Sequence, residues 1–239
     1  MQKNTSILKK DYWRAALKNF GSIDMLAIAG IIIALRVAVK AFSIPVVPGL
    51  YITFDAYINA VGAFIYGPLV SLAVGAVSDT LCAVLFPKGT YFLPFILTEM
   101  LSGFIFSLFL WKRDITAPKV ILSKFTVNFV CNIILTSIFM KWYYAFFGIE
   151  AAYPFINLAR IVKNLVLFPF EGVLIALVLW MIIPGLQRTR VADSSILTQK
   201  PTKKHILLTM FLLLLSAAIL LVYIFLLSPW LDAHNIKLL

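Results

Sequence analysis

Residues 66–98 read YGPLVSLAVGAVSDTLCAVLFPKGTYFLPFILT, and this stretch decides the class of protein. It places Asp79 inside an apolar run, which is followed by a loop rich in proline, glycine and aromatic residues and by a second apolar run. A carboxylate at membrane depth costs roughly 2.5–3.5 kcal/mol on insertion scales, so by default it marks a functional site. The stretch therefore predicts a membrane protein that binds a small molecule near Asp79.

The composition of the whole chain agrees with a membrane location. Of its 239 residues, 62% are hydrophobic and 13% are charged, and the mean hydropathy is +0.98. A soluble domain carries about 25% charged residues and roughly half apolar ones. The excess apolar residues lie in blocks long enough to cross a bilayer. We therefore predict an all-α, polytopic membrane protein.

Seven apolar blocks are candidate spans, because about 20 apolar residues cross the hydrocarbon core as a helix. The predicted spans are Ile23–Phe42, Ala56–Tyr66, Leu69–Phe86, Phe92–Trp111, Val120–Trp142, Ile156–Ile183 and Ile206–Leu227. The second is short, so it is either buried by its neighbours or continued by the preceding loop. The sixth is predicted to stop at Pro184-Gly185. The seventh, leucine-rich and uncharged, is typical of a lipid-facing helix added to a six-helix core.

The net charge of +11 does not indicate a nucleic-acid partner, because the basic residues lie at the ends of apolar blocks and suit lipid headgroups. They cluster in the first 20 residues, in 112–124 and in 188–204. The positive-inside rule then puts the N-terminus in the cytoplasm. We predict a basic cytoplasmic segment over 1–21, a membrane domain over 22–185, a cytoplasmic linker over 186–205, and an additional helix and tail over 206–239.

With this orientation, the connections 43–55, 86–92 and 143–155 lie outside. They are poor in net charge and rich in proline, glycine and aromatic residues. Such loops either fold over a ligand or serve as ordinary short connections. Their aromatic side chains, and those beside them, are suited to stacking a flat ring. They are Tyr51, Phe54, Tyr91, Phe92, Phe95, Trp142 and Tyr143; for the last two an aromatic belt at the membrane interface is the simpler explanation.

Small residues recur on one face of the first predicted helix, at Ala27, Gly30, Ala34 and Ala38. Intervals of three and four residues place them together and permit close helix approach. Two interpretations are open: the face packs inside this chain, or it docks onto another membrane subunit.

Charged residues form the second group of candidates. Arg36 and Lys40 lie one turn apart toward the outer end of the first helix, where they either snorkel to headgroups or face an anionic ligand. Asp79 either pairs with one of them or accepts hydrogen bonds from an amino-heterocycle, whose adjacent N–H and NH₂ groups match a carboxylate. The other intramembrane polar residues are Glu99, Asn128, Asn132, Arg160, Lys163, Asn164 and Glu171. Cations grouped toward the interior of the bundle suit a ligand that carries carboxylates.

Catalytic motifs are absent from the sequence. It contains no G-x-x-x-x-G-K-[ST], H-E-x-x-H or G-x-S-x-G pattern, so we expect neither an enzyme nor a bound cofactor. An ATP-driven pump built on this chain would need the ATPase of a partner. His205 and His234 are the only histidines, and both lie near the C-terminus, so no metal site is expected. Cys82 and Cys131 are predicted to be free thiols buried in the membrane.

Four segments carry a family resemblance. They are LAIAGIIIALRVAVKAFSIPV (26–46), YGPLVSLAVGAVSDTL (66–81), LFPKGTYFLPFILTEMLSG (85–103) and RIVKN (160–164). Together with the six-span core over about residues 23–184, they resemble the substrate-binding (S) components of energy-coupling factor (ECF) transporters, specifically the folate family. The linker and the seventh helix lie outside the resemblance.

The resemblance implies a six-helix bundle in a bacterial plasma membrane that binds a vitamin from outside. It also implies docking, through the small-residue face, onto a transmembrane scaffold that carries two ATPase subunits. We hypothesise that a pterin ring pairs with Asp79 and that the acidic end of folate lies near the basic residues. The candidate substrate-binding residues are Arg36, Lys40, Phe54, Asp79, Tyr91, Phe92, Phe95, Glu99, Asn128, Arg160 and Lys163. The alternatives are an S component for riboflavin or pantothenate, and a non-transport membrane adaptor or lipid enzyme.

Overall fold

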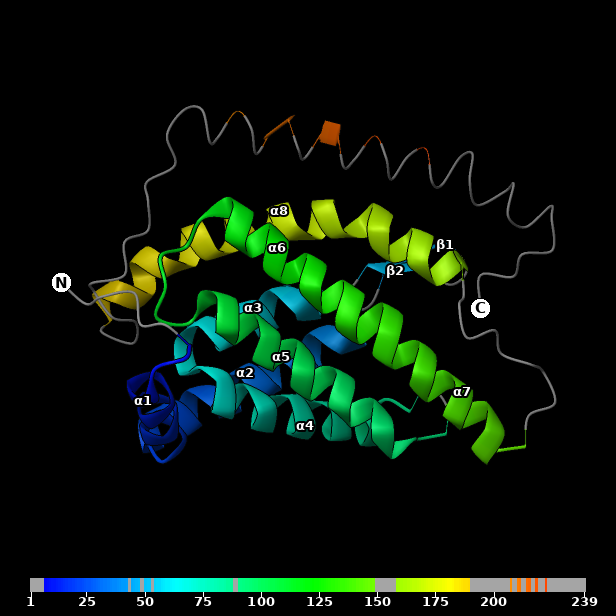
Figure 1. The fold of residues 1–239 in the computed structure, drawn as a ribbon, viewed down its shortest axis with the longest axis horizontal. Coiled ribbons are helices and arrows are strands. Elements are labelled where there is room, and N and C mark those ends of the chain that lie inside the picture. The colour runs from blue at the N-terminus through cyan, green and yellow to red at the C-terminus, as the bar shows by residue number, and fades with distance from the viewer. Residues whose placement is uncertain are drawn as a thin grey trace.

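The computed structural model describes residues 7–42, 44–47, 50–52, 54–87, 90–148 and 158–189, and the single positions 207, 210, 211, 214, 215, 218 and 222. Within these residues the chain is helical apart from one antiparallel hairpin, β1 (Ile44–Val47) paired with β2 (Leu50–Ile52). The long helices run side by side as a bundle, with α1 at one end and the hairpin toward the other (Figure 1). The fold is therefore the predicted helical bundle with one short strand pair.

The helices follow the predicted spans closely. Their bounds are α1 (Lys10–Phe20), α2 (Ile23–Ala41), α3 (Asp55–Tyr66), α4 (Pro68–Leu85), the 3₁₀ turn η1 (Leu93–Phe95), α5 (Ile96–Leu110), α6 (Ala117–Val127), the π-helix η2 (Asn128–Leu135), α7 (Thr136–Phe146) and α8 (Leu158–Arg188). The first four predicted spans match α2, α3, α4 and η1 with α5 within about two residues at each end. The fifth falls inside α6, η2 and α7, which follow one another without a break.

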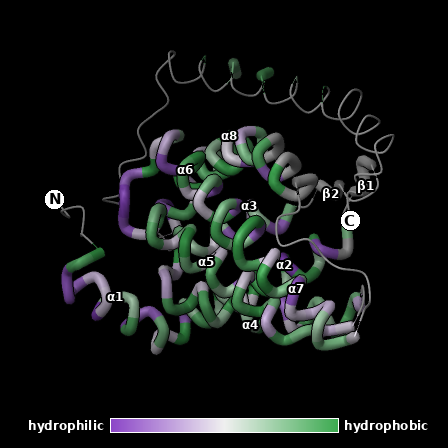
Figure 2. The backbone as a smooth tube through the Cα atoms, turned by 45° about the vertical axis from the view of Figure 1, so that its right-hand side comes forward, coloured by the Kyte–Doolittle hydropathy of each residue, from purple (hydrophilic) through white to green (hydrophobic). Residues whose placement is uncertain are grey.

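Four helical stretches in the described part of the chain are long and apolar enough to cross a membrane. They are Pro68–Leu85, Leu93–Leu110, Ala117–Phe146 and Phe168–Arg188. The pair of α1 and α2, bent by 74°, gives a fifth if it is taken as one broken span. Hydrophobic positions dominate the bundle, whereas hydrophilic ones gather on α1 and on the connection leading into α6 (Figure 2). Most of the predicted seventh span lies outside the described residues.

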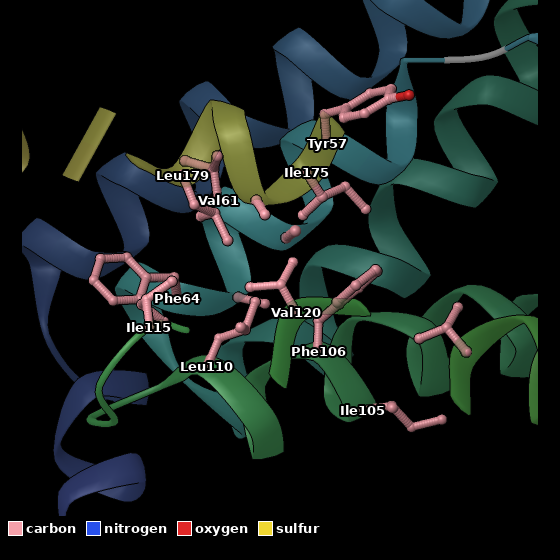
Figure 3. Packing of buried hydrophobic residues seen from close by; sticks show 14 of the residues in the cluster. Tyr57, Val61, Phe64, Ile105, Phe106, Leu110, Ile115, Val120, Ile175 and Leu179 are labelled. Carbon is pink, nitrogen blue, oxygen red and sulfur yellow. The ribbon is translucent and has the colours of Figure 1, made fainter. Parts of the chain in front are cut away.

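The short helix α3 is central to the bundle. Its residues Asp55, Tyr57 and 59–66 are all buried, and it packs against α2, α4, α5 and α8. Its side chains meet those of α5, α6 and α8 in the main apolar core, where Phe64, Phe106 and Leu179 lie among the residues of Figure 3. A helix of 12 residues cannot cross a bilayer alone at about 1.5 Å per residue. Burial by its neighbours therefore explains its length, and no continuation by the loop is needed.

Two boundary predictions were wrong. Helix α8 runs through Pro184 to Arg188, although Pro184-Gly185 was expected to end it. Proline removes one hydrogen bond, but residues on both sides stay helical here because Ile183 is fully buried and Leu186 packs on the core. Residues 143–146 were assigned to an outer loop, whereas α7 continues through them. The amphipathic helix α1, within a segment expected only to be basic, was not predicted as a helix.

Helix α1 is fixed to the end of the bundle opposite the hairpin. Tyr12 is fully buried and its ring lies 4.9 Å from that of Trp111, just past the end of α5. The Asn19 side chain donates a hydrogen bond to the Tyr66 carbonyl at 3.2 Å. Between α3 and α4, Gly67 has φ +83°, and a Cβ there would lie 2.6 Å from the Trp111 indole. The turn therefore requires glycine, for its backbone conformation and for space.

Candidate ligand-binding site

Charged side chains from four helices meet at the end of the bundle that carries the hairpin. Arg36 and Lys40 come from the last turns of α2, and Asp55 is the first residue of α3. Asp79 lies in the second half of α4, and Glu99 lies in the first turn of α5. The loops that join these helices, 43–54 and 86–92, leave the bundle at this end. We call these five side chains the charge network.

Arg36 is the centre of the charge network. Its Nε donates to Asp55 Oδ1 at 2.7 Å and its Nη2 to Asp55 Oδ2 at 2.9 Å, which is the paired geometry that suits guanidinium and carboxylate. The same Nη2 donates to Glu99 Oε2 at 2.6 Å. The Arg36 side chain is 0% exposed, and a charge at such a depth needs these partners. Arg36 therefore ties α2 to both α3 and α5.

Lys40 extends the charge network to α4. Its Nζ donates to Glu99 Oε1 at 3.1 Å and lies 3.7 Å from Asp79 Oδ1. Both cations of α2 thus have protein partners, so the structure does not support snorkelling to headgroups for either. Three carboxylates face two cations, which leaves the network with a formal charge of −1. Among the described residues Asp79 is held only by this 3.7 Å contact, so it is the carboxylate of the network with most capacity left to accept hydrogen bonds.

Close helix packing positions the carboxylates. Gly75 lies one turn before Asp79 in α4, and a Cβ there would lie 2.7 Å from the Glu99 carbonyl oxygen and from Met100 Cα. The absence of a side chain therefore lets α4 and α5 approach closely beside the network. One turn below Asp55, the Asn59 amide donates to Ser102 Oγ at 3.1 Å, which adds a second polar contact between α3 and α5.

An aromatic cluster lies beside this end of the bundle. Phe92, before η1, packs edge-on against Tyr143 at 5.7 Å and also contacts Phe146 and Phe147 of the α7 end. Phe95 contacts Phe92, Phe139 and Tyr143. Tyr91 is 43% exposed and its hydroxyl lies 3.4 Å from Thr80 Oγ1 of α4. The structure therefore brings the predicted aromatic residues 91, 92 and 95 together with α4 and α7.

Two of the predicted aromatic residues lie elsewhere. Phe54 is 44% exposed and contacts Tyr57, at the start of α3 rather than in the aromatic cluster. Trp142 contacts Phe139 and is 57% exposed, which agrees with an aromatic residue at the membrane interface. The Tyr51 side chain lies outside the described residues.

Asn128 belongs to a second polar cluster, where η2 faces α8. Asn132 donates to Asn128 Oδ1 at 3.1 Å and to Asn164 Oδ1 at 3.2 Å, and Asn128 donates to the Asn164 carbonyl at 3.3 Å. These contacts coincide with the π-helix η2, a backbone form often found at functional sites. One helical turn before Asn128, Lys124 pairs with Glu171 at 2.9 Å. Asn128 and the charge network are therefore separate groups.

The remaining predicted cations are placed only by their backbone. Arg160 and Lys163 lie in the first turns of α8, and their side chains are outside the described residues. Among the described residues, no group of three His, Cys, Asp or Glu side chains converges to hold a metal ion. Cys82 and Cys131 are buried free thiols, as expected from the sequence.

The small-residue face of α2 is turned outward. Ala27, Gly30, Ala34 and Ala38 are all exposed, and a Cβ on Gly30 would meet nothing within 4 Å. These residues therefore do not pack against the described part of the chain. On α2 the buried Arg36 therefore lies on the side that faces the bundle, whereas the small-residue face lies on the exposed side.

Asp55 is the member of the charge network that the sequence reasoning missed. It was taken as the last residue of an outer loop. One signal in the sequence was available: an acidic residue at the start of a short apolar helix. It becomes decisive only when α2 and α3 are placed side by side.

Comparison with known proteins agrees with this architecture. A family model described as "ECF-type riboflavin transporter, S component" matches residues 20–188. The Folate transporter FolT of Clostridium novyi (strain NT) is 26% identical over 153 residues, which cover 64% of this chain and 86% of that protein. The Folate transporter FolT of Leuconostoc mesenteroides is 33% identical over 108 residues, which cover 44% of this chain and 58% of that protein.

A solved structure is similar in fold as well as in sequence. "Crystal structure of FolT bound with folic acid" matches with a TM-score of 0.56 and 29% identity, over 66% of this chain and 93% of that chain. The matched region of the family model includes α2 to α8 and therefore every member of the charge network. The chain belongs to the S-component family of ECF-type transporters.

Proposed function

We propose that this protein is the substrate-binding subunit of an ATP-driven vitamin importer, and that its substrate is folate or a related pterin. The observation that carries the proposal is the charge network with its surplus carboxylate, Asp79, close to the aromatic cluster. Similarity to two folate transporters and to a FolT structure with folic acid supports the choice of substrate. The protein itself catalyses no reaction in this proposal.

The chemistry of a pterin fits Asp79. The ring carries an N–H and an NH₂ group side by side, and a carboxylate accepts from both at once. Aromatic side chains such as Phe92 and Tyr91 provide flat apolar surface for the ring, since aromatic pairs favour stacked or edge-on contact. The acidic end of folate then requires cations, for which Arg160 and Lys163 remain candidates.

Arg36 has a different role in this proposal from the one first expected. Its Nε and Nη2 donate three hydrogen bonds to Asp55 and Glu99, and the side chain is fully buried, although its Nη1 has no hydrogen-bond partner in the described structure. We therefore assign Arg36 as a positioning residue that holds α2, α3 and α5 together beneath the ligand. Lys40 and Glu99 connect this support to Asp79.

The partners follow from the family and from the outward face of α2. We propose that Ala27, Gly30, Ala34 and Ala38 form the docking face for a transmembrane scaffold with two ATPase subunits. Small residues allow two helices to approach closely in a bilayer, and these four lie exposed. In this proposal the α1 end, with its basic residues, lies in the cytoplasm and the charge network faces the outside, as the positive-inside rule predicts. Within this scheme, residues 22–185 are the binding domain, 186–205 a cytoplasmic linker and 206–239 an added helix and tail.

Riboflavin is the second candidate substrate, because the matching family model is described by that vitamin. Riboflavin also offers a flat ring with an N–H donor, but it has no carboxylates. Binding of folate should therefore require protein cations at the acidic end of the ligand, whereas binding of riboflavin should not.

A titration of the detergent-purified protein, without partners, tests the proposal. Its five tryptophans report binding of folate, riboflavin or pantothenate through their fluorescence. We expect saturable binding of folate with sub-micromolar affinity and none of the other two. Riboflavin binding without folate binding would keep the transporter and replace the substrate. If none of the three vitamins binds, the proposed function is wrong.

A further inference from the structure

An apolar groove lies at the opposite end of the molecule from the charge network. It encloses about 400 Å³ between α1 and the first turns of α4. Its walls are Leu17 and Phe20 of α1 and Leu69, Leu72 and Ala73 of α4. Leu17 is 62% exposed and Phe20 is 47% exposed, so within the described structure the groove is open to the surroundings.

The surface of helix α1 has three strips of different character, one of which lines the groove. Tyr12 and Ala16 form the buried strip and fix the helix to Trp111. Leu17 and Phe20, three residues apart, form the apolar strip that lines the groove. Lys10, Arg14 and Lys18 follow at intervals of four and form an exposed basic strip. Because Arg14 and Leu17 are three residues apart, the basic strip directly adjoins the groove.

The orientation of α1 and the character of its strips suit a helix that lies at the membrane surface. Helix α1 is bent by 74° from α2, so it lies across the end of the bundle instead of continuing through the bilayer. A helix with an apolar side and a row of Lys and Arg residues is typical of the interface between headgroups and acyl chains. Only Arg14 in the basic strip has a carboxylate neighbour among the described residues, Asp11 at 3.9 Å, and both side chains are more than three-quarters exposed. The strip therefore keeps most of its positive charge for an external partner.

We propose that this groove binds one anionic phospholipid. The acyl chain lies between α1 and α4, against Leu17, Phe20 and Leu72, and the phosphate contacts the basic strip. An apolar groove with an adjoining row of cations matches a molecule that has an alkyl chain and an anionic headgroup. A transmembrane helix of a partner would match the apolar walls but would not use the three cations. The site would anchor α1 to the anionic leaflet and thereby fix the angle between α1 and α2.

Native mass spectrometry of the full chain tests the proposal. The detergent-purified protein is mixed with phosphatidylglycerol or with phosphatidylcholine that has the same acyl chains, and the retained lipid is compared. We expect at least tenfold more phosphatidylglycerol to be retained. The combined change Lys10→Gln, Arg14→Gln and Lys18→Gln removes the basic strip and should abolish the preference, at roughly fivefold per cation. Lys119→Gln, at the same end of the bundle but outside the groove, is the matched control.

A second variant tests the groove itself. Leu17→Gln places a polar group on the apolar wall at an exposed position, so folding should be preserved, and we expect retention to fall at least fivefold. Leu8→Gln, at a position 93% exposed just before α1, is its control and should leave retention unchanged. Equal retention of the two lipids, or retention unaffected by Leu17→Gln, would overturn the proposal. Since vitamin binding is measured separately, neither result bears on the proposed function.

Discussion

Arg36 and Asp55 form a two-bonded ion pair that joins the end of α2 to the start of α3, with distances of 2.7 and 2.9 Å. The two residues bracket the hairpin β1–β2, so the pair closes the base of that connection. A buried ion pair contributes little net stability compared with an apolar replacement, but removing one partner alone is costly. The pair therefore serves mainly to fix the position of α2 relative to α3, and adds little to the stability of the protein.

The first prediction concerns this pair. Arg36→Met leaves Asp55 and Glu99 buried without their main partner, and Asp55→Leu leaves Arg36 with too few acceptors. Each single change should destabilise the protein by about 3–5 kcal/mol, while the double change should be closer to the unmodified protein. Thermal unfolding in detergent measures all three. Additive losses in the double variant would show that the two side chains do not act as a pair.

The second prediction concerns Asp79. Asp79→Asn removes a charge-assisted acceptor, and the loss of about 1.5–3 kcal/mol of binding free energy corresponds to roughly 10- to 150-fold weaker folate binding. The melting temperature should change little, because the ion-pair contact of Asp79 with Lys40 is long, at 3.7 Å. Asp114→Asn, a carboxylate at the other end of the bundle, is the control. A folate Kd that does not change would remove Asp79 from the site.

The third prediction concerns the space beside Tyr66. The Tyr66 ring lies over Gly62, where a Cβ would overlap the hydroxyl and lie 2.7 Å from Cζ. Gly62→Ala must therefore displace a fully buried ring, and we expect a loss of about 1–3 kcal/mol in unfolding free energy. Gly30→Ala is the matched control in a helix with open space, and it should be neutral or stabilising by about 0.5–1 kcal/mol. Equal melting temperatures for the two variants would contradict the packing argument.

The fourth prediction separates docking from ligand binding. Ala27→Leu and Ala34→Leu add bulk to the small-residue face of α2 without touching the buried charge network. The folate affinity of the isolated protein should be unchanged, whereas vitamin uptake by cells that contain the complete transporter should fall at least tenfold, because close helix approach is blocked. Leu35→Ile, an exposed change of equal volume on the same helix, is the control. Normal uptake by both variants would place the docking face elsewhere.

The helical spans could be predicted because their signals are local. Apolar blocks such as Leu69–Phe86 have the length that a bilayer demands, and Gly67-Pro68 marks the turn before α4 within one residue. The grouping of Ala27, Gly30, Ala34 and Ala38 on one face also followed from helical periodicity alone. Pro184 shows the limit of such rules: its local preference to end a helix was outweighed by packing of its neighbours on the core.

The partners of the charged residues could not be predicted in the same way. The sequence identified Arg36, Lys40, Asp79 and Glu99 as unusual at membrane depth, but each had several opposite charges within reach. The pairing depends on which helix ends lie together and on close approaches such as that at Gly75. Asp55 was missed for the same reason, since its partner lies 19 residues away on another helix.

The sequence by itself determined that this chain enters a membrane, where its first four spans begin and end within about two residues, and which side chains are too polar for their surroundings. These properties depend on hydrophobicity and period, which act over a few residues. Only the tertiary structure decided that Arg36 pairs with Asp55 and Glu99, that Asp79 lies 3.7 Å from Lys40, and that the small-residue face of α2 is exposed in the described structure. Those outcomes depend on distances of about 3 Å between helices far apart in the chain, and such distances are set by packing of the whole bundle.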